Sequence, residues 1–212
     1  MPLNRKMSAN YDNSAWFYDR LSKLVYGRAL VSSQIFLLQY IPERSHILIA
    51  GGGTGWILEE ISKIHPDGLV ITYAEVSAKM MKLSRKRNIA KNQVAYINEP
   101  VENMAMHNQY DIVITPFLFD NFTEKTVEKV FTHIHSRLKP KGLWLNTDFR
   151  LTGKWWQTIL LRSMILFFQI LCRIESKKLP DIEKRFELFK YLVINQKAFY
   201  GDFILSTAYQ KI

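Results

Sequence analysis

The residues from Gly51 to Gly55 hold four of the nine glycines of this 212-residue chain, in the run Gly-Gly-Gly-Thr-Gly. The run follows an apolar stretch, Ile47 to Ala50, and precedes a segment starting at Trp56 that has the apolar spacing of a helix. Glycines let a chain turn sharply and bring its backbone close to a ligand, and a helix start offers unpaired N–H groups. Together these features predict a loop that binds a nucleotide-like cofactor.

Spacing separates the cofactors that such a loop could take. A phosphate-binding P-loop needs Lys and Ser/Thr after its last glycine, whereas Trp56 and Ile57 follow Gly55. A dinucleotide fingerprint needs a small residue where Trp56 lies, which disfavours a nicotinamide dehydrogenase. The remaining pattern, Gly-x-Gly-x-Gly with Glu75 after the apolar run 69–74, fits a loop around a nucleoside that carries an amino acid. The Glu75 carboxylate would accept hydrogen bonds from both ribose hydroxyls.

Several motifs appear in the order found in one family. They are the glycine loop at 47–55, an acidic motif at 74–81, a strand motif at 110–115 and the turn Leu-Lys-Pro-Lys-Gly at 138–142. With these motifs the sequence resembles the class I S-adenosylmethionine-dependent methyltransferases, from about Tyr11 to the C-terminus. The Tyr-Asp pairs at 11–12 and 18–19 are similar to those of the subfamily that methylates quinones and other small lipophilic molecules.

The resemblance implies S-adenosyl-L-methionine as cofactor and methyl transfer to a small, lipophilic or aromatic acceptor. It implies that the loop glycines approach the methionine and ribose portions, and that Val76 and Met80 flank the adenine. Thr115 and Phe117 are expected to close the pocket. The expected cofactor-binding residues are Gly51, Gly52, Gly53, Gly55, Glu75, Val76, Met80, Glu99, Thr115, Phe117 and Tyr18.

Two positions depart from the family pattern. The family usually carries an acid two residues before the first loop glycine, where this chain has Ile49. It also usually has an Asp at the end of the third strand, where Pro100 lies with Glu99 and Glu102 alongside. These departures leave open an alternative function, a catalytically silent protein that binds S-adenosylmethionine or S-adenosylhomocysteine.

A catalytic base is needed only where the acceptor must lose a proton. The candidates are Tyr18, His107 and Asp120. Each has a structural alternative: helix packing for Tyr18, a surface loop for His107, and a turn residue before Thr123 for Asp120. The catalytic residue therefore stays unassigned, with Tyr18 and Asp120 as candidates.

Other chemistries lack the residues that they need. His133 and His135 lie two apart on a predicted helix and face different sides, so they make no metal pair, and we expect no metal site. No Gly-x-Ser-x-Gly turn of a hydrolase occurs. The single cysteine, Cys172, excludes an intramolecular disulfide, and charged residues interrupt any N-terminal signal core. We expect a cytoplasmic enzyme.

The formal net charge of +10 makes an anionic partner plausible. Basic residues gather after Glu75, at Lys79, Lys82, Arg85, Lys86, Arg87 and Lys91. No RNA-binding motif or interleaved aromatic residues accompany them, so a solvated helix face is favoured. An RNA methyltransferase stays a less favoured alternative, and nucleic acid is not an expected partner.

The order of apolar segments predicts an α/β fold. Strands are expected at 46–50, 69–74, 93–97, 110–115 and 142–148, and helices at 55–64, 77–89 and 123–138. This alternation predicts a parallel sheet with the ligand at the carboxyl ends of its strands. Two further strands, 191–200 and 202–211, would form an antiparallel hairpin around Gly201-Asp202. The class is a Rossmann-like, seven-stranded, mostly parallel sheet with helices on both faces.

We expect a single domain over 1–212. Its parts are an N-terminal helical cap of two helices at 1–43, a cofactor-binding core at 44–150, a helical lid at 151–190 and the terminal hairpin at 191–212. The apolar run 155–174 approaches the length of a membrane span, but Arg162 near its middle disfavours one. A core or lid helix is favoured, with contact to a membrane surface as the alternative. Both readings imply an apolar acceptor, and neither indicates an oligomeric state.

Overall fold

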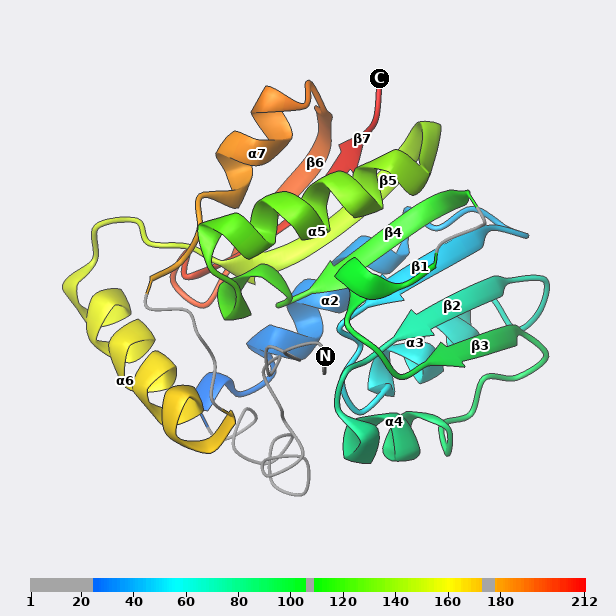
Figure 1. Ribbon diagram of the computed structural model, residues 1–212, viewed down its shortest axis with the longest axis horizontal. Helices are drawn as coiled ribbons and strands as arrows, with labels where there is room; N and C mark the ends of the chain where they lie inside the picture. The colour runs from blue at the N-terminus through cyan, green and yellow to red at the C-terminus, as the bar shows by residue number, and fades with distance from the viewer. Residues whose placement is uncertain (1–24, 106–108, 173–177) are drawn as a thin grey trace, which may run out of the picture.

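The computed structural model describes residues 25–105, 109–172 and 178–212, and these form a seven-stranded sheet with helices on both faces (Figure 1). The strand order is β3-β2-β1-β4-β5-β7-β6. The bounds are β1 (His46–Ala50), β2 (Val70–Ala74), β3 (Gln93–Ile97), β4 (Tyr110–Pro116), β5 (Leu138–Phe149), β6 (Leu192–Phe199) and β7 (Ile204–Gln210). Strands β1 to β5 pair in parallel, and β7 pairs antiparallel with both β5 and β6. The predicted Rossmann-like fold with its antiparallel hairpin is confirmed.

Both faces of the central strands β1 and β4 are buried, as in a parallel sheet that is covered by helices on each side. Alternate residues of each strand point to opposite faces. Ile47 and Ile49 pack towards α2 (Ala29–Leu38) and α3 (Trp56–Ile64), while Leu48 packs towards α5 (Glu124–Arg137) and α7 (Ile182–Leu188). In Figure 1, α5 and α7 lie in front of the sheet and α2 and α3 behind it. The apolar runs read from the sequence are therefore continuous because both of their sides are covered.

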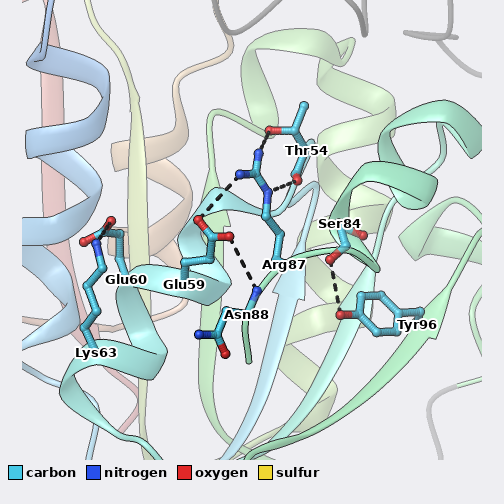
Figure 2. A network of polar contacts seen from close by, with 8 residues as sticks. All are labelled: Thr54, Glu59, Glu60, Lys63, Ser84, Arg87, Asn88 and Tyr96. Atoms are coloured by element: carbon cyan, nitrogen blue, oxygen red, sulfur yellow. Dashed lines mark hydrogen bonds and ion pairs between the residues drawn. The ribbon is translucent and has the colours of Figure 1, made fainter. Parts of the chain in front are cut away.

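Most element bounds agree with the sequence, but α4 (Ala78–Ser84) is shorter than the expected helix 77–89. The chain turns after Ser84, and Arg87 reaches back to the glycine loop (Figure 2). Its Nε donates to the Thr54 carbonyl oxygen at 3.0 Å, and its Nη1 lies 3.5 Å from Glu59 Oε2. Arg85 stands over the ring of Tyr96. Two members of the basic cluster are thus used within the fold, beyond the end of the helix.

Helix α6 (Trp155–Cys172) lies outside the two helical layers that cover the sheet (Figure 1). Its buried residues Leu161 and Ile165 pack with Phe149 and Phe203 at the end of β5 and the β6–β7 connection. The buried Gln157 side chain donates to the Gly201 carbonyl oxygen at 3.0 Å. Across the described ranges, no helix combines the length and apolarity needed to cross a membrane. The cytoplasmic location stays a prediction.

Thr115 is part of the sheet core, which corrects its expected place in the pocket. It is fully buried on β4, where its hydroxyl accepts from Trp144 Nε1 at 2.9 Å and donates to Asn146 Oδ1 at 2.8 Å. Trp144 is itself fully buried among the aromatic residues beneath α5 and α7. The Thr115 hydroxyl therefore satisfies the polar atoms of two β5 residues, a role that the apolar pattern of β4 does not reveal.

We predict that Thr115→Val lowers the free energy of unfolding by about 1–3 kcal/mol, because it leaves the Trp144 N–H and the Asn146 oxygen buried without this partner. Urea unfolding measures the loss. Binding of S-adenosylhomocysteine to the folded variant should be unchanged, and a weakened affinity would return Thr115 to the binding site.

Candidate functional site

A cavity of about 370 Å³ opens at the carboxyl ends of β1 to β5. This is the position at which ligands bind in open α/β sheets. Eight of the residues expected to bind cofactor or to act in catalysis line it: Gly51, Gly53, Glu75, Val76, Met80, Glu99, Phe117 and Asp120. Gly52, Gly55 and Thr115 are not among the lining residues. Tyr18 and His107 lie outside the described residues.

The four loop glycines divide into two pairs with different uses. Gly51 and Gly53 line the cavity with φ angles of +73° and +61°, which L side chains rarely adopt. A Cβ on Gly52 would lie 2.3 Å from the Tyr73 ring, and one on Gly55 would lie 2.5 Å from Ser84 Cβ. Gly52 and Gly55 are thus required by packing within the protein, and the loop approaches a ligand through Gly51 and Gly53.

Glu75 joins the glycine loop to the start of α4. The residue is only 6% exposed. Its Oε2 accepts from the Gly53 N–H at 2.9 Å, and its Oε1 accepts from the Ser77 N–H at 2.7 Å. Ser77 in turn caps α4, because its hydroxyl oxygen accepts from the Met80 N–H at 3.2 Å. The carboxylate therefore fixes both segments while it borders the cavity.

The segment after β3 lines the cavity with Glu99, Pro100, Val101 and Glu102. Asn98 holds this segment against β2, because its Nδ2 donates to the Glu75 carbonyl oxygen at 2.7 Å and to the Val76 carbonyl oxygen at 3.0 Å. Two carboxylates thus flank the proline that replaces the usual acid. We refer to Gly51, Gly53, Glu75, Met80 and the Glu99–Glu102 segment as the loop side of the cavity.

Ile49, the other departure from the family pattern, is fully buried in the core with α3 and does not line the cavity. The side chain points to the sheet face opposite the one on which Leu48 packs. The missing acid therefore leaves an apolar core position and not a gap in the cavity wall.

The remaining wall is mainly apolar and comes from α6, from the ends of β4 and β5, and from the start of α2 with the segment before it. We call this the apolar side; its residues are Val25, Tyr26, Leu30, Phe117, Phe149, Leu160, Met164 and Phe167. Phe117 has a left-handed φ of +52° and stacks at an angle on Phe149, with ring centroids 4.9 Å apart. Such strained backbone costs about 1–3 kcal/mol and gathers at functional sites.

Asp120 is the acid on this side, and a second carboxyl, Asp148 at the end of β5, lies behind it. Asp148 is 4% exposed; its oxygens accept from the Phe149 N–H at 2.9 Å and the Phe119 N–H at 3.2 Å. Burial raises the pKa of Asp148 to about 7. Burial, and then the charge of Asp148, raise the pKa of Asp120 well above its ordinary value. The pair can therefore hold or release a proton near neutral pH.

Several of these residues escaped the sequence analysis. Asp148 is the last residue of one predicted strand and Asn98 follows another, so the sequence predicts their position at the carboxyl edge of the sheet. The sequence does not predict that the Asp148 carboxyl is buried. Tyr26 lies in the expected N-terminal helices and was not singled out. His133 and His135 contact different partners, the Met104 carbonyl oxygen and the Tyr191 hydroxyl, as their spacing predicted.

Comparison with known proteins shows what the core of the chain is similar to. The family described as "Methyltransferase domain" matches residues 47–142. A malonyl-(acyl-carrier protein) O-methyltransferase of Priestia megaterium is 25% identical over 145 residues, which cover 68% of this chain and 51% of the relative. A ubiquinone/menaquinone biosynthesis C-methyltransferase of Wigglesworthia glossinidia brevipalpis is 36% identical over 49% of this chain and 42% of the relative. The chain spans about half the length of the curated relatives that it matches.

A solved structure shares the fold over nearly its full length. The magnesium protoporphyrin IX methyltransferase of Synechocystis PCC 6803, solved with bound S-adenosylhomocysteine, superposes with a TM-score of 0.65 at 13% identity. The match covers 95% of this chain and 96% of that one. The low identity supports the fold alone.

The two glycine pairs give a matched test. We predict that Gly55→Ala lowers the free energy of unfolding by about 2–4 kcal/mol, since a Cβ would clash with Ser84 and the backbone is left-handed. Gly53→Ala should cost about 1 kcal/mol, because within the described chain its Cβ would meet only Met80 Sδ, at 3.9 Å. Urea unfolding measures both.

Ligand binding should rank the two variants in the opposite order. Gly53→Ala places a methyl group at the cavity edge and should weaken S-adenosylhomocysteine binding about tenfold, while folded Gly55→Ala should bind almost normally. Equal loss of affinity in both variants would contradict this division of the loop.

Proposed function

We propose that this chain, whose residues 47–142 match the methyltransferase-domain family, is a class I S-adenosylmethionine-dependent methyltransferase that transfers a methyl group to a small, apolar acceptor held beneath α6. One observation supports this proposal most: a single cavity borders both the glycine loop with Glu75 and an apolar wall that carries Asp120. The first set suits a nucleoside with an amino acid, and the second suits an acceptor.

The loop side fits the cofactor S-adenosyl-L-methionine. Gly51 and Gly53 present backbone without side chains, and Val76 and Met80 supply apolar surface beside them. A carboxylate offers about four acceptor positions, so Glu75 can hold the loop and still accept hydrogen bonds from ribose hydroxyls. Glu99 and Glu102 are acceptors for the adenine amine in place of the usual Asp.

When bound, the cofactor supplies an electrophilic methyl group on a sulfonium whose departure leaves an uncharged thioether. The protein then has mainly to hold donor and acceptor close and aligned, which can lower the barrier by about 7–11 kcal/mol. The apolar side excludes water and orients an aromatic or aliphatic acceptor against Phe117 and Phe149. The two relatives are an O- and a C-methyltransferase by name, and the apolar wall leaves that choice open.

Asp120 is the residue that we propose as proton acceptor. The proton leaves the acceptor's hydroxyl or ring carbon and goes to the ionised Asp120 carboxylate as the new bond to the methyl group forms. Asp148 acts through Asp120, because its negative charge makes the neighbouring carboxylate more basic. The raised pKa makes the ionised Asp120 carboxylate a stronger base than an ordinary carboxylate.

The first test is binding. Glu75→Ala should weaken S-adenosylhomocysteine binding at least about tenfold, because it removes a charge-assisted acceptor at the loop side. Titration calorimetry measures this, and thermal unfolding tests whether the Gly53 and Ser77 contacts account for the loss. Glu75→Gln is the control of similar shape: it keeps one acceptor oxygen and should retain the fold with an intermediate affinity.

No binding by the folded wild-type protein at millimolar ligand would overturn the cofactor assignment. Binding without turnover of labelled cofactor, over a panel of quinols and phenols, would favour the catalytically silent alternative. Salt-sensitive RNA binding would instead favour the RNA methyltransferase.

The second test uses pH. Asp120 must be ionised to accept a proton, so kcat/KM should rise with pH along a limb set by its raised pKa. Asp148→Asn removes the neighbouring charge and should move this limb to lower pH, whereas Asp120→Asn should lower kcat about a hundredfold or more. Turnover measured across pH with the best phenol or quinol distinguishes the two variants.

If the rise of kcat/KM with pH occurs at the same pH in Asp148→Asn as in the wild type, Asp148 has no part in the mechanism.

The pH dependence of stability tests Asp148 independently of turnover. The folded-state pKa of Asp148 is raised from 3.8 to about 7, so the stability that its protonated form contributes is complete below about pH 4 and is lost as the pH rises through about 7. Asp148→Asn should flatten this decline.

A further inference from the structure

The outer face of α6 is apolar and exposed. Trp155, Ile159, Leu166 and Ile170 are 76%, 60%, 58% and 71% exposed. Their spacings of four and seven residues put them on one face of the helix, and Arg162, also exposed, falls on that face between them. Single exposed apolar residues are ordinary, but a row of four along one helix marks an interaction surface.

The opposite face of the same helix is already used. Leu161 and Ile165 pack into the cluster with Phe149 and Phe203, and Leu160 and Met164 line the cavity. The Tyr26 hydroxyl donates to Met164 Sδ at 3.2 Å. These contacts fix which face of α6 points outward, so the exposed row is a consequence of how the cavity is covered.

Charge identifies the partner that suits this face. Residues 150–178 hold six basic residues and one acidic residue, an excess of five out of the net charge of +10 for the whole chain. Helix α6 itself contains no Asp or Glu. The row has Arg162 within it and Trp155 at one end, and the charged residues on either side of the helix are mainly basic. This is the composition of a helix that lies in the interface of an anionic bilayer. A second copy of this chain would bring the same excess of positive charge.

We propose that α6 docks on an anionic lipid surface, with Trp155, Ile159, Leu166 and Ile170 in the boundary between head groups and acyl chains and Arg162 at the phosphates. The helix has 18 residues and would lie along the surface over about 27 Å. Residues 160, 163, 164 and 167 on its other face border the cavity. If the proposed function holds, an apolar acceptor could pass from the bilayer to the cavity along this helix; the docking itself does not rest on that function.

The test is cosedimentation of the full chain with vesicles, with no acceptor or cofactor present. Vesicles of phosphatidylcholine with phosphatidylglycerol should bind the protein, and vesicles of phosphatidylcholine alone should bind it less. The double variant Ile159→Glu/Leu166→Glu should bind anionic vesicles at least about tenfold more weakly, since it loses two apolar side chains that would insert into the bilayer and gains two negative charges. Leu188→Glu is the matched control, because Leu188 is 64% exposed on α7, and it should bind normally.

A second readout locates the contact. Brominated lipids should quench tryptophan fluorescence in the wild type, and Trp155→Phe should abolish most of that quenching. Failure of the wild type to bind anionic vesicles, or equal loss in Leu188→Glu, would overturn the proposal. So would a wild-type dimer that the double variant dissociates, which would assign the face to a second copy. S-adenosylhomocysteine binding in lipid-free buffer should match wild type in every variant, which separates this proposal from the proposed function.

Discussion

The loop side of the cavity depends on one buried carboxylate. Glu75 accepts from the Gly53 N–H and from the Ser77 N–H, and so ties the β1 loop, the end of β2 and the start of α4 to each other. A buried carboxylate is stabilised when hydrogen bonds replace its lost hydration, and the two backbone N–H groups supply such bonds. The same carboxylate borders the cavity, so one group both fixes the loop and offers hydrogen-bond acceptors to a ligand.

The glycine loop follows from the same constraint, since its backbone must come close enough to reach Glu75. Tyr73 fills the space beneath Gly52, and its hydroxyl donates to the Gly53 carbonyl oxygen at 2.9 Å. Arg87 closes the loop from outside through Thr54 (Figure 2). The glycine loop has almost no side chains, so Tyr73 of β2 and Arg87 beyond α4 hold it in place. Gly52 and Gly55 are required by packing within the protein, and Gly51 and Gly53 border the cavity.

The sequence was informative wherever local pattern and burial agree. Strand β1 lies at the predicted residues 46–50, where burial on both faces of a parallel sheet leaves a continuous apolar run. Strand β3 also lies at the predicted residues 93–97, although its residues are only partly buried. The pattern failed where distant partners matter: the chain turns after Ser84, where Arg87 contacts Thr54 and Glu59, and Thr115 is buried against Trp144 and Asn146 of β5. Asp148 was missed for a similar reason, since only the packing of β5 against the η3 turn (Phe119–Asn121) makes its carboxyl buried.

Helix α6 shows why composition alone left its role open. An apolar helix with little periodicity reads as buried on every side. In the fold it is anchored at one end, where Gln157 and Trp156 meet the turn at Gly201, and its inner face covers the cavity beyond the edge of the helical layers. A helix held at that edge can bury only one face within the chain. The apolar residues of its other face are exposed in the described fold, and they are the surface for which we propose an anionic lipid partner.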